Sequence, residues 1–281
     1  MTNVIHNLRF IYSPIIEELR SLAESVPNWI LSCLFSYKYD LKRYNNTFLC
    51  KNEDLGNNSL RSVNKVIYCF WTGDNEMSET RKKCLEQFRS RAGVPVVLVT
   101  PMNLNEYILP NYPLHRAYKY LSCVHKADYL RCYFMHHYGG GYGDVKKYKY
   151  RWNTFFNELN SSNKYALGYP EVRVKDVCHM YYDGVIGEDL KRHYRYLVGV
   201  CSFICRPYTP ITTEWYNELL SRMDSYANEL ERYPGDTYGK NIGYPIRWAN
   251  ILGAIFHPLS LKYNDKILQN NHIRPICKDY R

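Results

Sequence analysis

The chain has 281 residues, 46% of them hydrophobic, and its 37 Lys and Arg against 27 Asp and Glu give a net charge of +10. This length and composition can fill a substantial core, and we expect one principal domain. The positive charge favours anionic partners such as phosphates, nucleic acid or a membrane surface. Because the basic residues are scattered and form no Lys/Arg block, the composition argues against a dedicated nucleic-acid arm.

Ten cysteines are dispersed, with no C-x-x-C pair and no Cys/His cluster at zinc spacing. This usage favours free thiols in a reducing compartment over a disulfide scaffold. The first residues lack a cationic flank followed by an apolar region, so we expect no signal peptide. The most apolar run, residues 29–35, is too short to span a bilayer. We therefore expect a cytoplasmic protein without a transmembrane segment.

Residues 1–64 are expected to form an N-terminal helical extension. Ser13 before Pro14 is typical of a helix start, and apolar residues at helical spacing continue to Pro27, where we expect the helix to end. A second short helix is expected over about residues 28–37, followed by loop-like sequence. We expect the extension to pack against the main domain rather than lie on a membrane.

Two apolar runs with a helical pattern between them follow the extension. Residues 66–71 and 94–99 read as buried strands, and the residues between them repeat at helical spacing. Strand, helix and strand form a βαβ unit of a Rossmann-like α/β sheet, in which ligands lie outside the carboxyl ends of strands. This places residues 70–74 at the mouth of a site. The other interpretation of Trp71 is a plain core aromatic.

A helix is predicted over about residues 114–138, with a possible break near Ser122. Asp128 and Arg131 are three residues apart and therefore neighbours on that helix. The glycines that follow cannot continue a helix, so we expect residues 139–141 to form a sharp turn. The chain should then enter a strand with Asp144 at or near its carboxyl end, where small residues let backbone approach a sugar hydroxyl.

The remaining elements alternate in type. Residues 164–169 and 196–205 are predicted strands, a long helix is expected after Pro210, and another over residues 244–256. Residues 170–195 are polar, Tyr-rich and without a sustained period, so we expect a long functional loop on the acceptor side of a site.

Residues 127–131 (A-D-Y-L-R), followed by residues 138–146 (Y-G-G-G-Y-G-D-V-K), resemble a known signature. The signature is that of GT-A glycosyltransferases with a sugar-binding D-x-D motif, among them capsular-polysaccharide synthesis proteins, α-mannosyl-transferring enzymes and clostridial glucosylating toxins. Residues 65–73 are similar to the first strand of these enzymes, which ends in a Trp against the uracil. The resemblance covers residues 65–150 with specific motifs and extends more weakly to about residue 260.

The resemblance implies an α/β fold with a GT-A type, Rossmann-like mixed sheet flanked by helices over residues 65–281, with a donor half to about residue 150 and an acceptor half beyond it. It implies transfer of a sugar from a nucleotide-diphosphate sugar, for which we expect UDP, to a hydroxyl of an oligosaccharide or glycoprotein glycan. The donor-binding residues that it implies are Phe70, Trp71, Thr72, Asp128, Arg131, Tyr142, Gly143, Asp144 and Lys147, with a weaker match at His272.

The chain departs from the signature at Lys146, where the family has its second Asp. That Asp normally holds Mn²⁺ or Mg²⁺, and a charged lysine cannot ligate a divalent cation. An ammonium group can, however, supply a fixed positive charge where negative charge develops. We predict a metal-independent enzyme without a cofactor, in which Lys146, helped by Lys147 or Arg131, replaces the metal. The alternative is a degenerate, non-catalytic nucleotide-sugar-binding relative whose Lys146 points to solvent.

The catalytic base and the stereochemistry stay open. An inverting enzyme needs a base for the acceptor hydroxyl, and the candidates are Asp236, Glu188 and Asp183, in that order. A retaining enzyme needs no such base because the departing phosphate can take the proton.

Two other classes of protein compete with the transferase. A basic nucleic-acid-binding protein would explain the charge but not the Asp-x-x-Arg and Gly-rich pattern. A Rossmann oxidoreductase would require G-x-G-x-x-G after the first strand, and the chain does not have it there.

Overall fold

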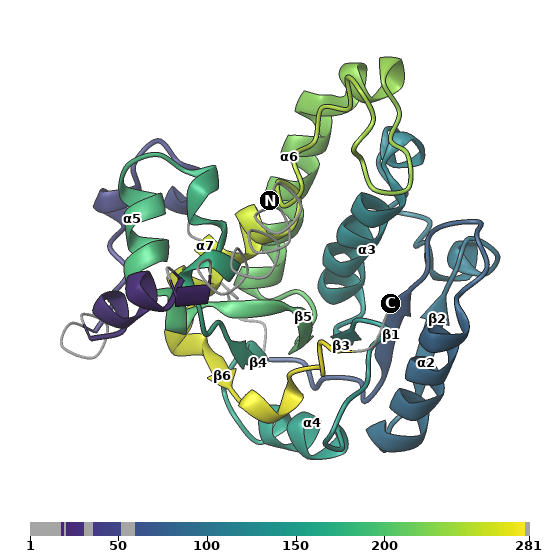
Figure 1. Ribbon diagram of the computed structural model, residues 1–281, viewed down its shortest axis with the longest axis horizontal. Coiled ribbons are helices and arrows are strands. Elements are labelled where there is room, and N and C mark those ends of the chain that lie inside the picture. Colours follow the sequence, from purple (N-terminus) through teal and green to yellow (C-terminus); the bar gives the residue numbers. More distant parts are fainter. Residues whose placement is uncertain (1–17, 20, 31–35, 52–59, 279–281) are drawn as a thin grey trace, which may run out of the picture.

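The computed structural model describes residues 18–19, 21–30, 36–51 and 60–278. At its centre is a six-stranded mixed sheet of order β2-β1-β3-β5-β4-β6 (Figure 1). The strands are β1 Ile67–Phe70, β2 Val96–Val99, β3 Gly140–Gly143, β4 Ala166–Pro170, β5 Val198–Cys205 and β6 Ile267–Gln269. β1 runs parallel to β2 and β3, β5 is antiparallel to β3 and β4, and β6 is parallel to β4.

Helices cover both faces of this sheet. They are α2 Glu79–Ala92, α3 Cys123–His137, α4 Asn153–Asn160, α5 Val185–Arg192, α6 Pro210–Arg232 and α7 Gly253–Lys262. Because successive strand residues point to opposite faces, Ile67 and Cys69 join a core with α2 and α4, whereas Tyr68 and Phe70 join one with α3, α6 and α7. The predicted fold class, a mixed α/β sheet flanked by helices, is confirmed and is consistent with a Rossmann-like GT-A fold.

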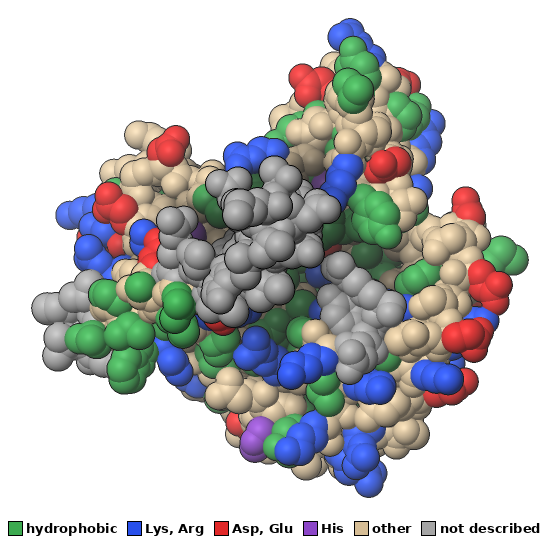
Figure 2. Space-filling view, in the orientation of Figure 1, with side chains coloured by type: hydrophobic (Ala, Val, Ile, Leu, Met, Phe, Trp, Pro, Cys, Tyr) green, Lys and Arg blue, Asp and Glu red, His purple; other side chains and the backbone are tan. Residues whose placement is uncertain are grey.

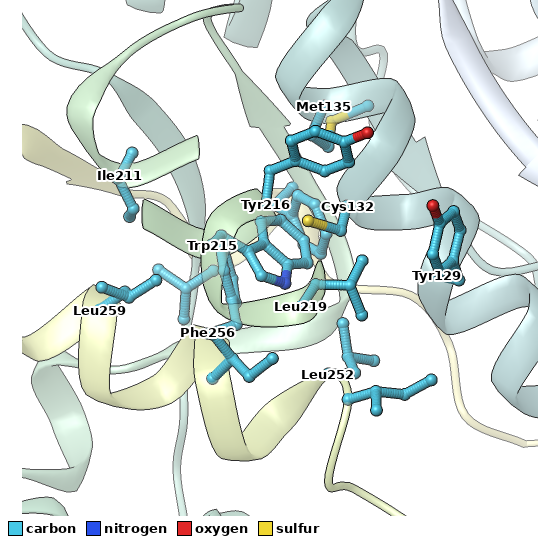
Figure 3. Close-up of a cluster of buried hydrophobic side chains, with 14 of the residues drawn as sticks. Tyr129, Cys132, Met135, Ile211, Trp215, Tyr216, Leu219, Leu252, Phe256 and Leu259 are labelled. Carbon is cyan, nitrogen blue, oxygen red and sulfur yellow. The ribbon is translucent and has the colours of Figure 1, made fainter. Parts of the chain in front are cut away.

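The larger core fixes α3 to the rest of the molecule. Figure 3 shows side chains of α3, α6 and α7 gathered around Trp215, whose ring centre lies 4.5 Å from that of Phe256. Cys132, on the same helix as Asp128 and Arg131, is fully buried in this cluster. The predicted donor helix is therefore held by close packing and presents its amino-terminal half to the carboxyl ends of β1 and β3.

The glycine run after α3 is a strand and not the turn expected from the sequence. Gly139 and Gly140, at φ +64° and +92°, make the reversal, and β3 begins at Gly140. A Cβ on Gly141 would lie 2.9 Å from the Trp152 ring, and one on Gly143 would lie 2.7 Å from the Phe88 ring. The glycines therefore let buried aromatic rings touch the strand backbone, a requirement that the sequence pattern does not reveal.

Three other element predictions also need correction. Residues 170–195 are not a long loop, since 3₁₀ turns at Val174–Asp176 and Cys178–Tyr181 precede α5. The helix expected over residues 244–256 starts only at Gly253, because residues 244–247 are irregular and residues 248–252 form turns. Near the amino terminus, residues 21–30 are all helical, so the helix does not end at Pro27. These short elements pack against several neighbours, so their sequences show no simple hydrophobic period.

The helix predicted after residue 114 begins later, with Ser122 as its cap. A 3₁₀ turn at Tyr118–Tyr120 precedes it, and the Ser122 side chain accepts a hydrogen bond from the His125 N–H. The expected break near Ser122 is thus confirmed.

Part of the predicted N-terminal extension contacts the main domain. The Arg43 guanidinium donates two hydrogen bonds of 2.7 Å to the buried carboxylate of Asp189, which also accepts one from the Tyr44 hydroxyl. Tyr44 and Leu49 belong to the larger core. The expected helix start at Ser13 lies outside the described residues, and the boundary at residue 64 stays a prediction.

Within the described ranges, no helix is long and apolar enough to cross a membrane. The nine cysteines in those ranges are all free thiols.

We predict that Gly143→Ala lowers the free energy of unfolding by about 1–3 kcal/mol, because the added methyl overpacks a full core. Phe88 cannot yield easily, since its ring is fully buried and stacks 3.9 Å from that of Tyr148. Urea denaturation measures the change. Lys83→Ala, on the exposed side of α2, is the control and should stay within about 0.5 kcal/mol of the parent. A neutral Gly143→Ala would show that the Phe88 contact is not close.

Candidate functional site

A cavity of about 280 Å³ lies at the carboxyl ends of β1 and β3. Its walls come from the residues after both strands, the first turn of α2, the amino-terminal half of α3 and the loop after α6. This is where α/β sheets of this kind bind ligands. Six residues predicted to bind the donor line the cavity: Phe70, Trp71, Thr72, Arg131, Tyr142 and Asp144.

The residues that follow β1 are held in place by hydrogen bonds. The Trp71 N–H donates to the Val99 carbonyl, and its indole Nε1 donates to the Asn75 carbonyl at 2.8 Å. The Thr72 hydroxyl donates to the Cys123 carbonyl at 2.5 Å, which ties this segment to the start of α3. Because Trp71 is only partly buried and lines the cavity, it is not a plain core aromatic.

Arg131 is held between several groups. Its guanidinium lies 3.6 Å from the Asp128 carboxylate, 3.5 Å from that of Asp144 and 4.4 Å from the centre of the Tyr142 ring. It also donates to the Val200 carbonyl at 3.3 Å. Its Nε is buried and has no hydrogen-bond partner among the described residues.

Asp144 directly follows β3 and is the centre of the polar network. Its Oδ1 accepts a 2.5 Å hydrogen bond from the Tyr142 hydroxyl, and its Oδ2 lies 2.8 Å from the Lys146 ammonium. Burial raises the pKa of Asp144, but the charges of Arg131 and Lys146 and the hydrogen bonds outweigh burial and hold this pKa below its usual 3.8. Asp144 is thus ionised at neutral pH.

Lys146 is turned inward and does not point to solvent. The residue is only 6% exposed, and its ammonium donates to Cys201 Sγ at 3.5 Å as well as pairing with Asp144. Burial lowers the pKa of Lys146, but the negative charge of Asp144 outweighs burial and raises this pKa above its ordinary value. The neighbouring Lys147 is exposed, and its backbone carbonyl accepts a hydrogen bond from the Ile276 N–H.

Asp128 differs in character from Asp144. It is 4% exposed, and burial raises its pKa, although the positive charge of Arg131 and the proximity of His125 oppose the rise. The site therefore combines one carboxylate held ionised with one carboxyl group that is costly to ionise. Carboxylate oxygens of this kind can accept hydrogen bonds from hydroxyl groups.

A divalent metal ion does not fit the residues around Asp144. Both carboxylate oxygens already have partners, and the Lys146 ammonium lies where a cation would bind Oδ2. Mg²⁺ is usually bound through one or two carboxylates together with waters and substrate phosphates, and both oxygens of Asp144 are already taken by Tyr142 and Lys146. In the part of the chain that the structure describes, no three His, Cys, Asp or Glu residues are grouped so that they could hold a metal.

The other predicted site residues lie away from the cavity wall. Gly143 contacts the Phe88 ring from within β3, and His272 is exposed, with its ring centre 4.1 Å from that of Tyr150. Glu188 is exposed on α5. Asp183 lines a different cavity, together with residues 43–48. Asp236 is exposed but directly precedes Thr237 and Tyr238, which do line the cavity.

Two features of the cavity were not predicted from the sequence. Arg81, in the first turn of α2, lines the cavity and donates to the Val145 carbonyl at 2.7 Å. The sequence could have indicated the place of Arg81, because the helix after the first strand of a βαβ unit begins at the ligand-binding edge of the sheet. Thr237 and Tyr238 approach from a segment more than 90 residues beyond Asp144, and no local pattern indicates this contact.

Comparison with known proteins supports a glycosyltransferase-like family. Residues 35–173 match the family model of the capsular polysaccharide synthesis protein. This segment is just under half of the chain and includes β1, β3 and α3 with Asp128, Arg131, Asp144 and Lys146. No curated protein and no solved structure matches the chain significantly.

We predict that Lys146→Met lowers the free energy of unfolding by about 2–4 kcal/mol near neutral pH, since a buried carboxylate loses its closest cation. The lowered pKa of Asp144 means that its ionised form stabilises the fold above about pH 4, and that this contribution is lost as the pH falls through the folded-state pKa. The deficit of the variant should therefore shrink below pH 4.

Denaturant titrations from pH 3 to pH 8 measure this dependence, and Lys147→Met, on an exposed neighbour, is the control. Equal effects of the two substitutions would contradict the buried ion pair.

Proposed function

We propose that the protein transfers a sugar from a nucleotide-diphosphate sugar, with UDP as the expected nucleotide, to a hydroxyl of a glycan, without a bound divalent metal ion. The observation that carries this proposal is the pairing of Asp144 with Lys146 and Arg131 beside a cavity at the carboxyl ends of β1 and β3. The match to the capsular polysaccharide synthesis family supports the reaction class.

The cavity walls suggest how the donor would lie. Phe70, Trp71 and Thr72 form an aromatic and hydroxyl-bearing wall suited to a flat base. Asp144 provides the acceptor oxygens that ribose and sugar hydroxyls need, and Asp128, which is not part of the cavity wall, pairs with Arg131.

Two guanidinium groups, those of Arg131 and Arg81, line the same cavity and can approach the diphosphate. An arginine presents its donors in a planar fork that matches phosphate geometry.

In this reaction the bond between the anomeric carbon and the diphosphate oxygen breaks, and the diphosphate leaves with the electron pair. The acceptor oxygen forms the new bond, and its proton passes to a base or to the departing phosphate. The developing negative charge is stabilised by fixed cations in a partly buried site, where they act more strongly than in water. Lys146 contributes by holding Asp144 ionised and in place, and by its own field, in the role that a metal has elsewhere in the family.

We predict that a UDP-hexose raises the melting temperature of the protein and is hydrolysed or transferred at the same rate with and without EDTA. A ligand at 100 times its Kd stabilises a protein by about 2.7 kcal/mol, which is several degrees for a chain of this size. Asp144→Asn should reduce the shift. Loss of turnover in EDTA with recovery in Mn²⁺ would refute metal independence, and binding without consumption would support the degenerate relative.

We further predict that Lys146→Asp creates a binding site for Mn²⁺. The substitution puts a second carboxylate beside Asp144 in place of the ammonium, which removes the competing cation and adds oxygen ligands. Differential scanning fluorimetry with and without Mn²⁺ should show stabilisation of Lys146→Asp only. Lys147→Asp, which adds the same charge at an exposed position, is the control. If Mn²⁺ stabilises the parent equally, Lys146 does not occupy the position of the metal.

A further inference from the structure

The chain segment of residues 233–244, here named the rim loop, lies between the end of α6 and the donor cavity. Figure 1 shows α6 projecting beyond the sheet and the chain that follows it returning beside α6. Figure 2 shows hydrophobic side chains on this projecting part, among charged ones. Within the rim loop, Thr237 and Tyr238 line the cavity, and Tyr238 is 58% exposed. An exposed aromatic ring thus borders the donor site.

The rim loop is bonded to the first turn of α3. The N–H groups of Cys123 and Val124 donate to the carbonyls of Asp236 and Thr237, each at 3.3 Å. A helix leaves these first N–H groups without a partner inside the helix, so the loop completes the cap that Ser122 begins. The Gly235 N–H also donates to the Tyr120 carbonyl at 2.9 Å. Since α3 carries Asp128 and Arg131, the rim loop is fixed to the donor-binding helix.

Asp236 holds the loop from within. Its Oδ1 accepts hydrogen bonds from the backbone N–H groups of Tyr238, Gly239 and Lys240, at 2.8, 2.5 and 3.2 Å. Desolvation raises the pKa of Asp236, which is exposed, but these three backbone hydrogen bonds outweigh it and lower this pKa below its ordinary value. A carboxylate with this bonding is a poorer proton acceptor but a firm support for the backbone of Tyr238.

We propose that the rim loop is the acceptor-binding wall of the site, where the ring of Tyr238 stacks against a pyranose of a saccharide acceptor and Asp236 is a positioning residue that orients Tyr238. This inference rests on the proposed function. A tyrosine ring offers a flat apolar face to the C–H groups of a sugar and a hydroxyl to its oxygens, at a low cost in side-chain entropy. Because the loop and the donor residues share α3, the acceptor would be held in fixed register with the donor.

The test compares substitutions at Asp236 and Tyr238, using a UDP-hexose as donor and methyl glycopyranosides as acceptor probes. Hydrolysis of the donor by water reports the donor site alone, and transfer to the glycoside reports both sites. Tyr238→Ala should raise the KM for the glycoside about 10-fold or more, a larger factor than any rise in the KM for the donor in hydrolysis. Tyr238→Phe, which keeps the ring, should retain most of the transfer activity.

Asp236→Asn distinguishes a positioning residue from a base, because an asparagine oxygen accepts the same backbone bonds but cannot take a proton at neutral pH. We expect Asp236→Asn to keep its kcat within about threefold and its pH profile unchanged, and Asp236→Ala to raise the KM for the glycoside. A loss of about 100-fold or more in the kcat of Asp236→Asn would identify a base and overturn the positioning role.

Ile242→Ala is the matched control, because Ile242 lies in the same loop, is 99% exposed and is not part of the cavity wall. If Ile242→Ala and Tyr238→Ala impair transfer equally, the loop acts as a general apolar contact and not as a sugar platform. Unchanged transfer by Tyr238→Ala with intact donor hydrolysis overturns the inference alone. A parent protein that neither binds nor consumes any UDP-hexose overturns the proposed function together with it.

Discussion

The buried pairing of Asp144 with Lys146 and Arg131 is the interaction on which the site depends. The carboxyl groups of Asp128 and Asp144 lie 2.8 to 3.6 Å from the cationic groups of Arg131 and Lys146. Asp128 and Arg131 are about one turn apart on α3, and Asp144 and Lys146 follow β3. Taking such charges out of water is expensive, and the cost is recovered only if each finds a partner of opposite sign. An unpaired Lys146 would destabilise the fold, and an unpaired Asp144 would become neutral.

The position of this pair follows from the backbone that precedes it. Asp144 is placed by β3, and β3 can lie against the rings of Trp152 and Phe88 only because Gly141 and Gly143 have no Cβ. On the other face of the strand, the Tyr142 ring stacks with Phe70 and supports the guanidinium of Arg131. Residues 140–143 therefore form a strand, let aromatic rings pack on both of its faces and orient the polar groups. The composition of this segment has structural as well as chemical reasons.

Sequence reasoning predicted those parts of the molecule that depend on local pattern. Continuous apolar runs predicted β1 and β2, and the spacing of Asp128 and Arg131 placed both on one side of α3. The resemblance predicted that Trp71 and Asp144, 73 positions apart, lie at one site. Sequence reasoning did not predict the features that depend on residues far away in the chain. The glycines of β3 are required by the rings of Trp152 and Phe88, and the short helices near α5 pack against residues 43–49. Tyr238 reaches the cavity because its loop is hydrogen-bonded to α3. An inward Lys146 was predicted with a solvent-facing Lys146 as the alternative, because burial and exposure are both compatible with its place in the chain.

The pairing of charges within the site bears on whether a metal ion must enter with the donor. If a metal accompanied the donor, it would bring positive charge to the site together with the diphosphate, and the protein would need acidic ligands to receive it. Here Asp144 is paired with Lys146, and Arg131 lies between Asp128 and Asp144, so these groups already have partners before any ligand enters. The charge of a diphosphate must then be met by groups at the cavity wall, which include Arg81, and by the positive field of a chain with net charge +10. Under the proposed function, the cations of the wall would receive the anionic donor without a metal entering with it.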